Sequence, residues 1–208
     1  MTEDDPYAKV PYRKGAGQAI VDLLAFPLRA LISDDMNERL GLTSLRHERC
    51  AFAARFCEGL VLDVGCGTNK LAAIRKNVIG LDVHPWAEID VLADTTAMPF
   101  ADGTFDTVTL IACLNHVTRR AEVLAECRRV LKEGGKIVVT MIPPVIGAVT
   151  HPLYFWWDPD QRERRKSKGE LPGMWTSHVV RLLREAGFHN IEHHRFVYKL
   201  NNLFVGRK

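Results

Sequence analysis

A glycine turn directly after a short buried strand is the feature that most constrains how this chain can fold. The segment 60–64 is apolar apart from Asp63, and it runs into Gly65-Cys66-Gly67. Helical patterns separate it from the later apolar segments, which cover residues 78–82, 89–92, 105–111 and 136–142. Strands that are apolar on both faces and alternate with helices are typical of a mostly parallel sheet covered on two sides.

The C-terminal part of the chain departs from this alternation. After a helix over 177–186, which Gly187 closes, residues 191–198 and 202–205 are predicted to form two strands around a short polar turn. Such a hairpin would add an antiparallel edge to the sheet. The sequence therefore predicts an α/β fold with a doubly wound, mostly parallel, seven-stranded sheet, helices on both faces and a C-terminal antiparallel hairpin.

The chain is expected to divide into an N-terminal arm and helix over 1–43 and a main domain over 44–208. Within the main domain, residues 143–175 form an insert between the fifth strand and the last helix. The first helix is predicted at about 17–31, and a polar turn at 33–37 follows it.

Capping residues mark the ends of two further helices. One begins near Ser44, with Ser44 or Thr43 as its N-cap, and is predicted to end at Gly59. Farther along the chain, Thr118 is predicted to cap a helix that runs to Lys132 and is terminated by Gly134-Gly135, just before the fifth strand.

The net charge of +3 has a single source. Residues 162–170 hold five Lys/Arg and two Asp/Glu, so this segment accounts for all of it and the rest of the 208-residue chain is neutral. Proteins that track nucleic acid spread a basic face over several elements. The distribution argues against a nucleic-acid partner. The segment is predicted to be a solvated loop, with contact to RNA or an acidic lipid as the alternative.

The cysteines and the N-terminus bear on the compartment. The five cysteines include no C-x-x-C pair, and an odd number without that spacing predicts reduced thiols in a cytosolic protein. The N-terminus is acidic and no apolar run follows it, unlike a secretory signal. We therefore expect a cytoplasmic protein.

Two apolar segments raise the question of a membrane. Residues 137–157 carry no Asp, Glu, Lys or Arg, but Pro143, Pro144 and Pro152 interrupt them. This pattern predicts a buried strand followed by an apolar loop rather than a spanning helix. The segment 20–32 predicts a kinked amphipathic helix lying on the core, with peripheral association with a lipid surface as the alternative.

Polar groups follow each of the first four strands. In open α/β sheets, ligands bind outside the carboxyl ends of the strands. Here those ends carry Gly65 and Gly67, then Asp82, then Asp94-Thr95, then Asn115-His116. Glycines let the backbone approach a ligand closely, and a carboxylate after the second strand suits a ribose diol. A carboxylate after the third strand can accept a hydrogen bond from an exocyclic amine.

The glycine turn does not fit a nicotinamide cofactor. The dinucleotide fingerprint G-x-G-x-x-G needs a third glycine where this chain has Lys70. Asp63, two residues before the first glycine, is unsuited to a pyrophosphate and suits an ammonium group. A ligand with a ribose, an adenine and a cationic tail but no phosphate is S-adenosylmethionine.

At these motifs the chain resembles the class I S-adenosylmethionine-dependent methyltransferases, and within them the small bacterial enzymes grouped as type 11. The resemblance covers residues 44–142 closely and 176–205 more loosely. It rests on an ordered series of motifs: Val61-Leu62-Asp63-Val64-Gly65-Cys66-Gly67, Gly80-Leu81-Asp82, Asp94 with Met98-Pro99-Phe100, Phe105-Asp106-Thr107-Val108 and Arg129-Val130-Leu131-Lys132-Glu133-Gly134-Gly135. One departure is Asn69, where the family often has a third glycine. Because Asn tolerates left-handed backbone, the turn is expected to survive.

The resemblance implies a role for each matching residue. Asp63 would organise the loop and the amino end of the cofactor, and the two glycines would let backbone pass close to its amino-acid tail. Asp82 would hold the ribose hydroxyls, and Asp94 would bond the adenine amine with Thr95 beside it. The predicted cofactor-binding set is Asp63, Gly65, Cys66, Gly67, Asp82, Val83, Asp94 and Thr95.

Methyl transfer from a sulfonium needs mainly alignment of the acceptor. If the acceptor must lose a proton, His116 is the candidate catalytic base, because it follows the fourth strand. Arg46 and His47 are weaker candidates for reaching over the site. The predicted acceptor site comprises Asn115, His116, Trp157 and Trp175. No metal site is predicted, since the paired histidines at 193 and 194 would point to opposite faces of a strand.

The insert is rich in aromatic residues, namely Tyr154, Phe155, Trp156, Trp157 and Trp175. This composition fits a pocket for an apolar or aromatic small molecule, with simple packing of the insert onto the core as the alternative. We therefore expect direct in-line methyl transfer to a small apolar or aromatic acceptor. Two other classes stay open, a non-catalytic S-adenosylmethionine-binding protein and a nicotinamide-dependent oxidoreductase. The sequence leaves open the accepting atom and the oligomeric state.

Overall fold

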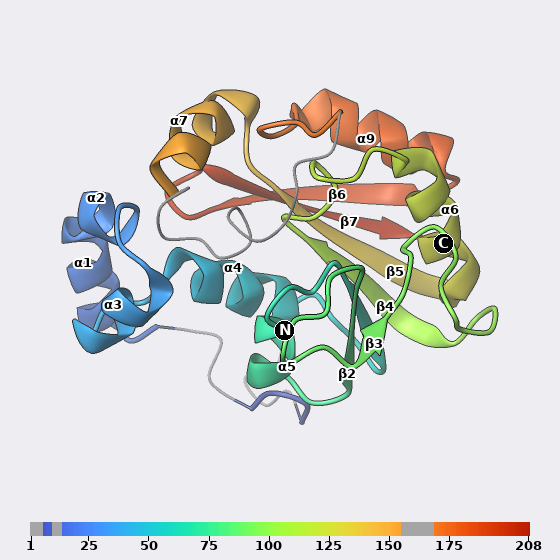
Figure 1. Ribbon diagram of the computed structural model, residues 1–208, viewed down its shortest axis with the longest axis horizontal. Helices are drawn as coiled ribbons and strands as arrows, with labels where there is room; N and C mark the ends of the chain where they lie inside the picture. Colours follow the sequence, from blue (N-terminus) through green and yellow to red (C-terminus); the bar gives the residue numbers. More distant parts are fainter. Residues whose placement is uncertain (1–5, 10–13, 155–168) are drawn as a thin grey trace.

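One mixed sheet organises the molecule (Figure 1). The computed structural model describes residues 6–9, 14–154 and 169–208, with side chains up to residue 150 in the second range. The strand order is β3-β2-β1-β4-β5-β7-β6. In chain order the strands are β1 (Val61–Val64), β2 (Val78–Asp82), β3 (Val91–Leu92), β4 (Phe105–Ile111), β5 (Leu131–Met141), β6 (His189–Phe196) and β7 (Asn201–Arg207).

The first five strands are parallel, and β7 runs antiparallel between β5 and β6. This architecture confirms the predicted fold class, including the C-terminal hairpin. The strand order reverses between β1 and β4, so the carboxyl ends of these two strands border the crevice in which ligands of open α/β sheets bind.

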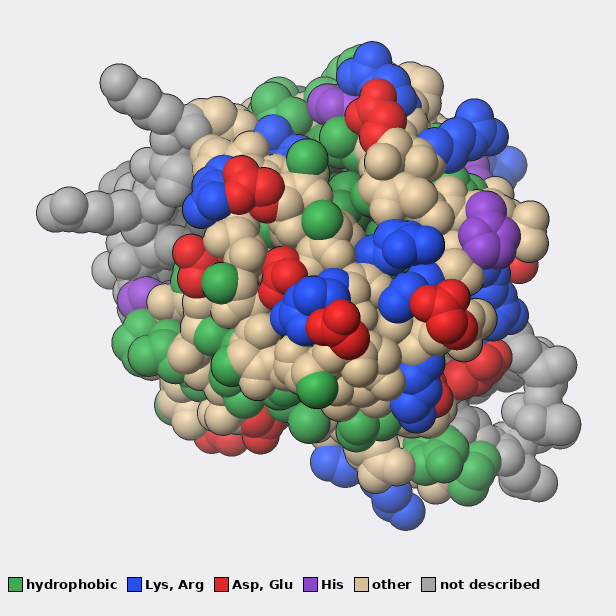
Figure 2. Space-filling view, turned by 90° about the vertical axis from the view of Figure 1, so that its right-hand side faces the viewer, with side chains coloured by type: hydrophobic (Ala, Val, Ile, Leu, Met, Phe, Trp, Pro, Cys, Tyr) green, Lys and Arg blue, Asp and Glu red, His purple; other side chains and the backbone are tan. Residues whose placement is uncertain are grey.

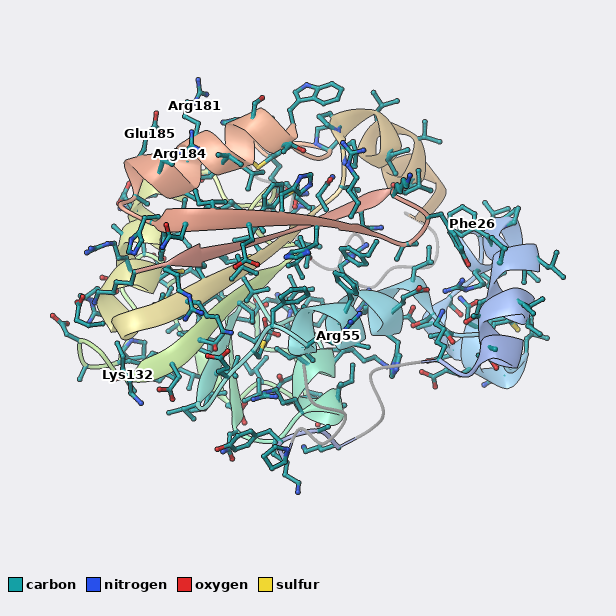
Figure 3. The ribbon with its side chains drawn as sticks, turned by 180° about the vertical axis from the view of Figure 1, so that it is seen from behind. Phe26, Arg55, Lys132, Arg181, Arg184 and Glu185 are labelled. Carbon is teal, nitrogen blue, oxygen red and sulfur yellow. The ribbon has the colours of Figure 1, made fainter. Side chains whose placement is uncertain are left out.

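Helices cover both faces of the sheet (Figure 1). On one face α4 (Leu45–Ala54) and α5 (Lys70–Ile74) share a buried cluster with Val61. On the other, α6 (Arg120–Val130) and α9 (Thr176–Glu185) join the largest core. The charged residues of α9 project away from the sheet, as Figure 3 shows for Arg181, Arg184 and Glu185, because its apolar residues face inward.

Helix α4 begins as predicted and ends earlier than predicted. The Ser44 hydroxyl accepts a hydrogen bond from the backbone N–H of His47 at 3.1 Å, as an N-cap does. The helix ends at Ala54 rather than at Gly59. Gly59 has a φ of +55° and serves the entry to β1, because a Cβ there would lie 2.3 Å from Asp106 Oδ2.

The junction of α6 and β5 also corrects the prediction. Helix α6 begins after Arg119 without a side-chain cap, so Thr118 is not its cap. The helix ends at Val130, and β5 begins at the next residue and runs through Gly134. Leu131 is fully buried and pairs with Phe105 of β4. This tertiary pairing overrides the local glycine signal that predicted a longer helix.

Two segments predicted as irregular are helices. The predicted turn at 33–37 belongs to α3 (Asp34–Arg39), whose N-cap Ser33 accepts a hydrogen bond from Met36 N at 3.2 Å. The predicted apolar loop contains α7 (Pro144–Tyr154), which begins at a proline. The sequence contains an ordinary start signal for each helix. In α3 an N-cap residue precedes two acidic residues, and in α7 a proline occupies the first helical position. No helix among the described residues is long and apolar enough to span a membrane.

The predicted first helix is divided at Ala25 into α1 (Ala16–Leu24) and α2 (Phe26–Arg29). Together with α3 these helices form a layer beside the sheet, which we call the N-terminal cap (residues 16–43) (Figure 1). The prediction that its apolar face lies on the core holds for Phe26, which packs against a buried cluster, and is wrong for the apolar side chains of α1. Asp22 and Arg29 are buried, whereas Leu24 is 78% exposed. The cap's ring contact with the main domain is Phe26, labelled in Figure 3, whose ring lies 4.9 Å from that of Tyr198.

Candidate active site

A cavity of about 1400 Å³ opens at the carboxyl ends of the parallel strands, as bounded by the described residues. Its wall draws on the cap, α4, the glycine turn, the loops after β2, β3 and β4, α7 and residues 170–172. A site for one small ligand measures roughly 300–1,000 Å³. The cavity therefore has room for a nucleoside cofactor and a second small molecule.

Most of the predicted site residues line this one cavity. They are Asp63, Gly65, Cys66, Gly67, Asp82, Val83, Asp94, Thr95, Asn115 and His116. Arg46 also lines it, whereas His47 does not. Trp175 is 58% exposed and lines a separate hollow on α9, so the structure does not bring it to the others. Trp157 lies outside the described residues.

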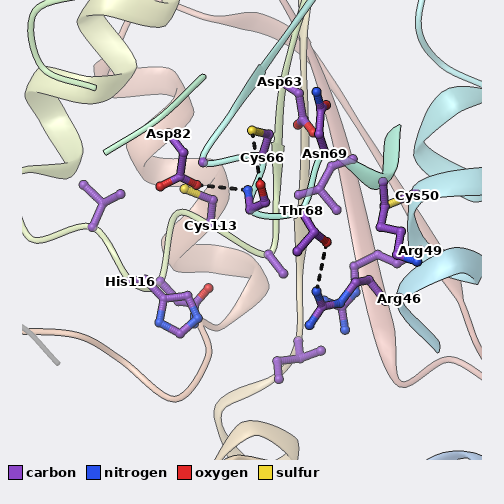
Figure 4. Close-up of a pocket in the computed structure, with 18 of the residues that line it drawn as sticks. Arg46, Arg49, Cys50, Asp63, Cys66, Thr68, Asn69, Asp82, Cys113 and His116 are labelled. Atoms are coloured by element: carbon purple, nitrogen blue, oxygen red, sulfur yellow. Dashed lines mark hydrogen bonds between the residues drawn. The ribbon is translucent and has the colours of Figure 1, made fainter. Parts of the chain in front are cut away.

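The glycine turn is held against the end of β2 (Figure 4). Gly67 has a φ of +55°. A Cβ there would meet nothing within 4 Å, so the side of its Cα that would carry a side chain faces open space. The Gly67 N–H donates to Asp82 Oδ2 at 2.9 Å, and the His84 N–H donates to Asp82 Oδ1 at 2.9 Å. These bonds fix the carboxylate, whose remaining lone pairs can accept hydrogen bonds from a diol.

Asp63 is a buried carboxyl in the wall of the cavity, only 3% exposed. Burial raises its pKa to about 7, and the negative charge of Asp82 adds to the rise. The Thr109 hydroxyl donates to Asp63 Oδ1 at 2.5 Å and partly offsets it. A carboxyl in such surroundings is stabilised in its charged form by a cationic ligand group. The two carboxylates therefore provide the hydrogen-bond acceptors that a ligand with a ribose and an ammonium needs.

Asn69 occupies the position of the missing glycine and keeps the turn, as predicted. Its φ is +50°, in the left-handed region. Its side-chain amide donates to the Glu88 carbonyl at 2.9 Å and to Asp90 Oδ2 at 3.1 Å. The same Asp90 oxygen accepts from the Gly80 N–H at 2.7 Å. Asn69 thus ties the turn after β1 to β2 and to the loop that follows it.

Gly80→Ala should disturb this tie, because a Cβ at position 80 would lie 2.7 Å from Asn69 Cγ. Overpacking of this kind costs roughly 1–3 kcal/mol. We expect urea denaturation to show that loss for Gly80→Ala, and the double variant Asn69→Gly/Gly80→Ala to regain part of it. A neutral Gly80→Ala, or a double variant less stable than Gly80→Ala alone, would contradict the packing described for Asn69.

A hydrogen-bonded group forms the other end of the cavity. His116 Nδ1 lies 3.1 Å from Glu170 Oε2, and the Asn115 side-chain amide lies 3.1 Å from His116 Nε2. The same amide donates to the Leu171 carbonyl at 3.1 Å. With the proton on Nδ1, the imidazole donates to Glu170 and its Nε2 is the acceptor. Glu170 was missed from sequence, where it belonged only to a charged segment 54 residues away.

Apolar side chains also line the cavity. They come from the cap, α4, β4, the loop after it, the segment after β5 and the end of the insert, namely Ile32, Leu45, Ile111, Val117, Ile142 and Leu171. Arg46 reaches from α4 to the glycine turn, where its Nη1 lies 3.4 Å from Thr68 Oγ1 (Figure 4), and its Nε lies 3.2 Å from Asp34 Oδ2.

The described residues contain no group of three His, Cys, Asp or Glu placed to hold a metal ion. The five cysteines are all free thiols, in agreement with the sequence prediction.

Comparison with known proteins agrees with this geometry. Residues 62–139 match the family described as "Methyltransferase domain". A demethylmenaquinone methyltransferase of Thermotoga maritima is 26% identical over 176 residues, which cover 70% of this chain and 76% of that protein. Another of the same name from Renibacterium salmoninarum is 51% identical over 93 residues, 38% of this chain and 39% of that one.

A solved structure shares the fold. A SAM dependent methyltransferase from Archaeoglobus fulgidus superposes with a TM-score of 0.57 at 17% identity, covering 83% of this chain and 98% of that one. The ordered motifs, the carboxylates at the strand ends and these matches agree on one cofactor, S-adenosylmethionine. The chain carries a methyltransferase domain, and its relatives and fold support a class I S-adenosylmethionine-dependent methyltransferase.

Proposed function

We propose that the protein methylates a small, apolar, aromatic acceptor, the reduced (hydroquinone) form of a demethylated quinone. The names of the two relatives specify demethylmenaquinone for those proteins. The observation that carries the proposal is the His116–Glu170 pair, in a cavity whose wall also includes the apolar side chains named above. Apolar wall groups beside a candidate base suit an aromatic ring with an ionisable hydroxyl.

The residues of β1, β2 and β3 would hold the nucleoside. Asp82 takes the ribose hydroxyls, with Val83 beside the ring. Asp94 takes the adenine amine, with Thr95 next to it. Asp94 Oδ1 accepts from the Thr96 N–H and hydroxyl at 2.8 Å each, and these bonds lower its pKa, which keeps it an ionised acceptor.

Asp63 and Arg46 would hold the amino-acid tail. Asp63 offers the tail ammonium a buried negative charge, and Cys66 with the two glycines supplies the bare backbone between them. Arg46 Nη1 lies at the Thr68 hydroxyl, on the rim of the glycine turn. A guanidinium there suits the carboxylate that neighbours the ammonium. The two ends of the tail would then be fixed by opposite charges.

When bound, the cofactor supplies a methyl group already activated on a sulfonium. The protein's part is to hold the acceptor in line with that methyl, a contribution of roughly 7–11 kcal/mol for well-oriented reactants. The apolar wall orients the ring and excludes water. Asn115 and His116 would lie on the side of the acceptor ring that faces away from the methyl group. Once the Asn115 amide turns aside, His116 Nε2 can receive the hydroxyl proton, while Glu170 holds Nδ1–H.

Replacing His116 by Gln should lower kcat by at least tenfold and leave the affinity for S-adenosylhomocysteine unchanged, because His116 acts on the acceptor. Glu170→Gln should lower kcat less and alter the pH profile of the rate, because it weakens the orientation of the imidazole. Arg181→Gln, an exposed change on α9 at a residue that pairs with Glu185 and does not line the cavity, is the control and should alter neither value. Equal kcat in all three variants would refute the base role.

The acceptor class is tested with radiolabelled S-adenosylmethionine. We expect label to enter a reduced, demethylated naphthoquinone in the presence of the purified protein, at a rate that saturates with the acceptor. Parallel reactions contain transfer RNA and a catechol. Label in RNA alone, or in none of the acceptors, would overturn the proposal.

A further inference from the structure

Large apolar side chains are exposed at one end of the molecule. In the cap, Ile20, Val21, Leu23, Leu24, Leu28, Leu31, Met36 and Leu40 are between 43% and 78% exposed. On α7, Val145 and Val149 are 61% and 60% exposed and lie one turn apart. In Figure 1 the cap and α7 lie at the same end of the molecule, and both border the cavity, through Ile32 of the cap and Ala148 of α7.

The cap is held by polar contacts within it, by an ion pair with α4 and by the packing of Phe26 on the main domain, rather than by these leucines. The Arg29 guanidinium is 1% exposed and donates to the Thr43 carbonyl at 2.8 Å and the Asp22 carbonyl at 2.9 Å. It also pairs with Glu48 of α4. Asn37, 1% exposed, donates to the Ser33 carbonyl at 3.1 Å. A helix that buries its charge and exposes its leucines reverses the usual pattern of a surface helix, so its leucines are available to something outside the chain.

The opposite end of the molecule does not share this character. Figure 2 shows basic and acidic side chains interspersed there, with ion pairs such as Lys132–Asp106 at 2.7 Å. Among the described residues, most of the exposed large apolar side chains therefore lie on the cap and α7, and both of these border the cavity. Clustered exposure of this extent marks an interaction site.

We infer that the cap and α7 dock on a lipid surface, from which the acceptor enters the cavity. The inference rests on the proposed apolar acceptor, which would dissolve in such a surface. A folded partner seated across both elements would close the mouth between them, whereas a fluid lipid layer conforms to two separate convex helices and leaves the acceptor a path. The side chains of α1 and α7 enter the boundary between headgroups and acyl chains.

The charge of the cap indicates how it binds. Residues 16–43 contain four Asp/Glu and two Lys/Arg, so attraction to anionic headgroups does not drive the contact. Burial of apolar side chains does. Binding should therefore occur on uncharged vesicles and should change little with salt.

The test is co-sedimentation of the full chain with phosphatidylcholine vesicles. Wild-type protein should bind, and both Ile20→Ser/Leu24→Ser and Val145→Ser/Val149→Ser should lower the partition coefficient by about tenfold or more. The control is Leu92→Ser, a residue 58% exposed on β3, which should bind like wild type. Thermal unfolding checks that every variant remains folded. Methylation of a short-chain, water-soluble acceptor should be unaffected by the cap and α7 changes.

Three outcomes would overturn the docking surface. The first is that the wild type fails to bind vesicles. The second is that a variant combining all four serine substitutions binds as well as wild type. The third is that light scattering shows a dimer that the same substitutions dissociate. The last would make a second copy the occupant. Failure of the proposed acceptor is read separately, since vesicle binding is measured without cofactor or methyl transfer.

Discussion

Replacing Asp63 by Asn is expected to stabilise the cofactor-free protein at pH 8 and at the same time to weaken cofactor binding. The pKa of this carboxyl is about 7 in the folded protein, against an ordinary value of 3.8. Keeping it ionised at pH 8 therefore costs roughly 4 kcal/mol of folding free energy. Asn removes the charge and still accepts from the Thr109 hydroxyl. Because its amide must find new partners, we expect a net gain of about 2 kcal/mol.

The pH dependence has a definite sign. Below about pH 3 the carboxyl is protonated in both the folded and the unfolded chain and contributes nothing. As the pH rises towards 7, the unfolded chain releases the proton and the folded protein keeps it, so the free energy of unfolding falls. Above about pH 8 the contribution is constant. Urea denaturation of wild type and Asp63→Asn across this range should show a difference that grows from near zero at about pH 3.

Cofactor binding should respond in the opposite direction. A tail ammonium beside Asp63 favours the ionised carboxyl, so wild-type affinity for S-adenosylhomocysteine should rise between about pH 5 and 7 with release of a proton. The loss of a charged hydrogen bond should make Asp63→Asn bind roughly 10–100-fold more weakly at pH 8. Calorimetry in buffers of different ionisation enthalpy measures both effects.

Asp106→Asn is the matched control for Asp63. Its carboxylate pairs with Lys132 at 2.7 Å and its pKa is lowered by that contact and by the Leu60 N–H, despite partial burial. Removing its charge should destabilise the protein and leave cofactor affinity unchanged. If Asp63→Asn bound the cofactor as tightly as wild type and with the same pH dependence, Asp63 would not face the ammonium.

Arg29→Met should detach the N-terminal cap. The buried guanidinium connects two segments of the cap with Glu48 of α4, and its removal leaves Glu48 and Asp22 with Lys14 as their remaining cationic contact. Breaking a buried ion pair in this way costs about 3 kcal/mol. Hydrogen exchange should show faster exchange over residues 16–43, and the strands should keep their protection.

Arg39→Met provides the control, because Arg39 is an exposed residue at the end of α3. It should change the free energy of unfolding by no more than about 0.5 kcal/mol. Unchanged exchange of the cap in Arg29→Met would mean that the contact of Phe26 with Tyr198 holds the cap without the ion pairs.

Local sequence patterns predicted most of the fold and the cofactor-binding part of the candidate site. The segment around Asp63 and the glycine turn combine a short apolar strand with a sharp reversal, and both properties belong to neighbouring residues. The parallel arrangement followed from strands without polar faces. Asp82 could be placed because the carboxyl ends of parallel strands meet at one edge. The missed starts of α3 and α7 carried local signals as well, at Ser33 and Pro144.

The sequence by itself determined the sheet, the glycine turn and the carboxylates after β1 and β2, because these depend on residues close together in the chain. Only the tertiary structure decided that Glu170 meets His116, that Trp175 lies away from the cavity, and that the cap buries Arg29 while exposing Leu24. Each of these depends on which distant segments pack together. Hydrophobic periodicity gives the two sides of a helix, but the partner that covers either side is set by contacts between residues far apart in the chain.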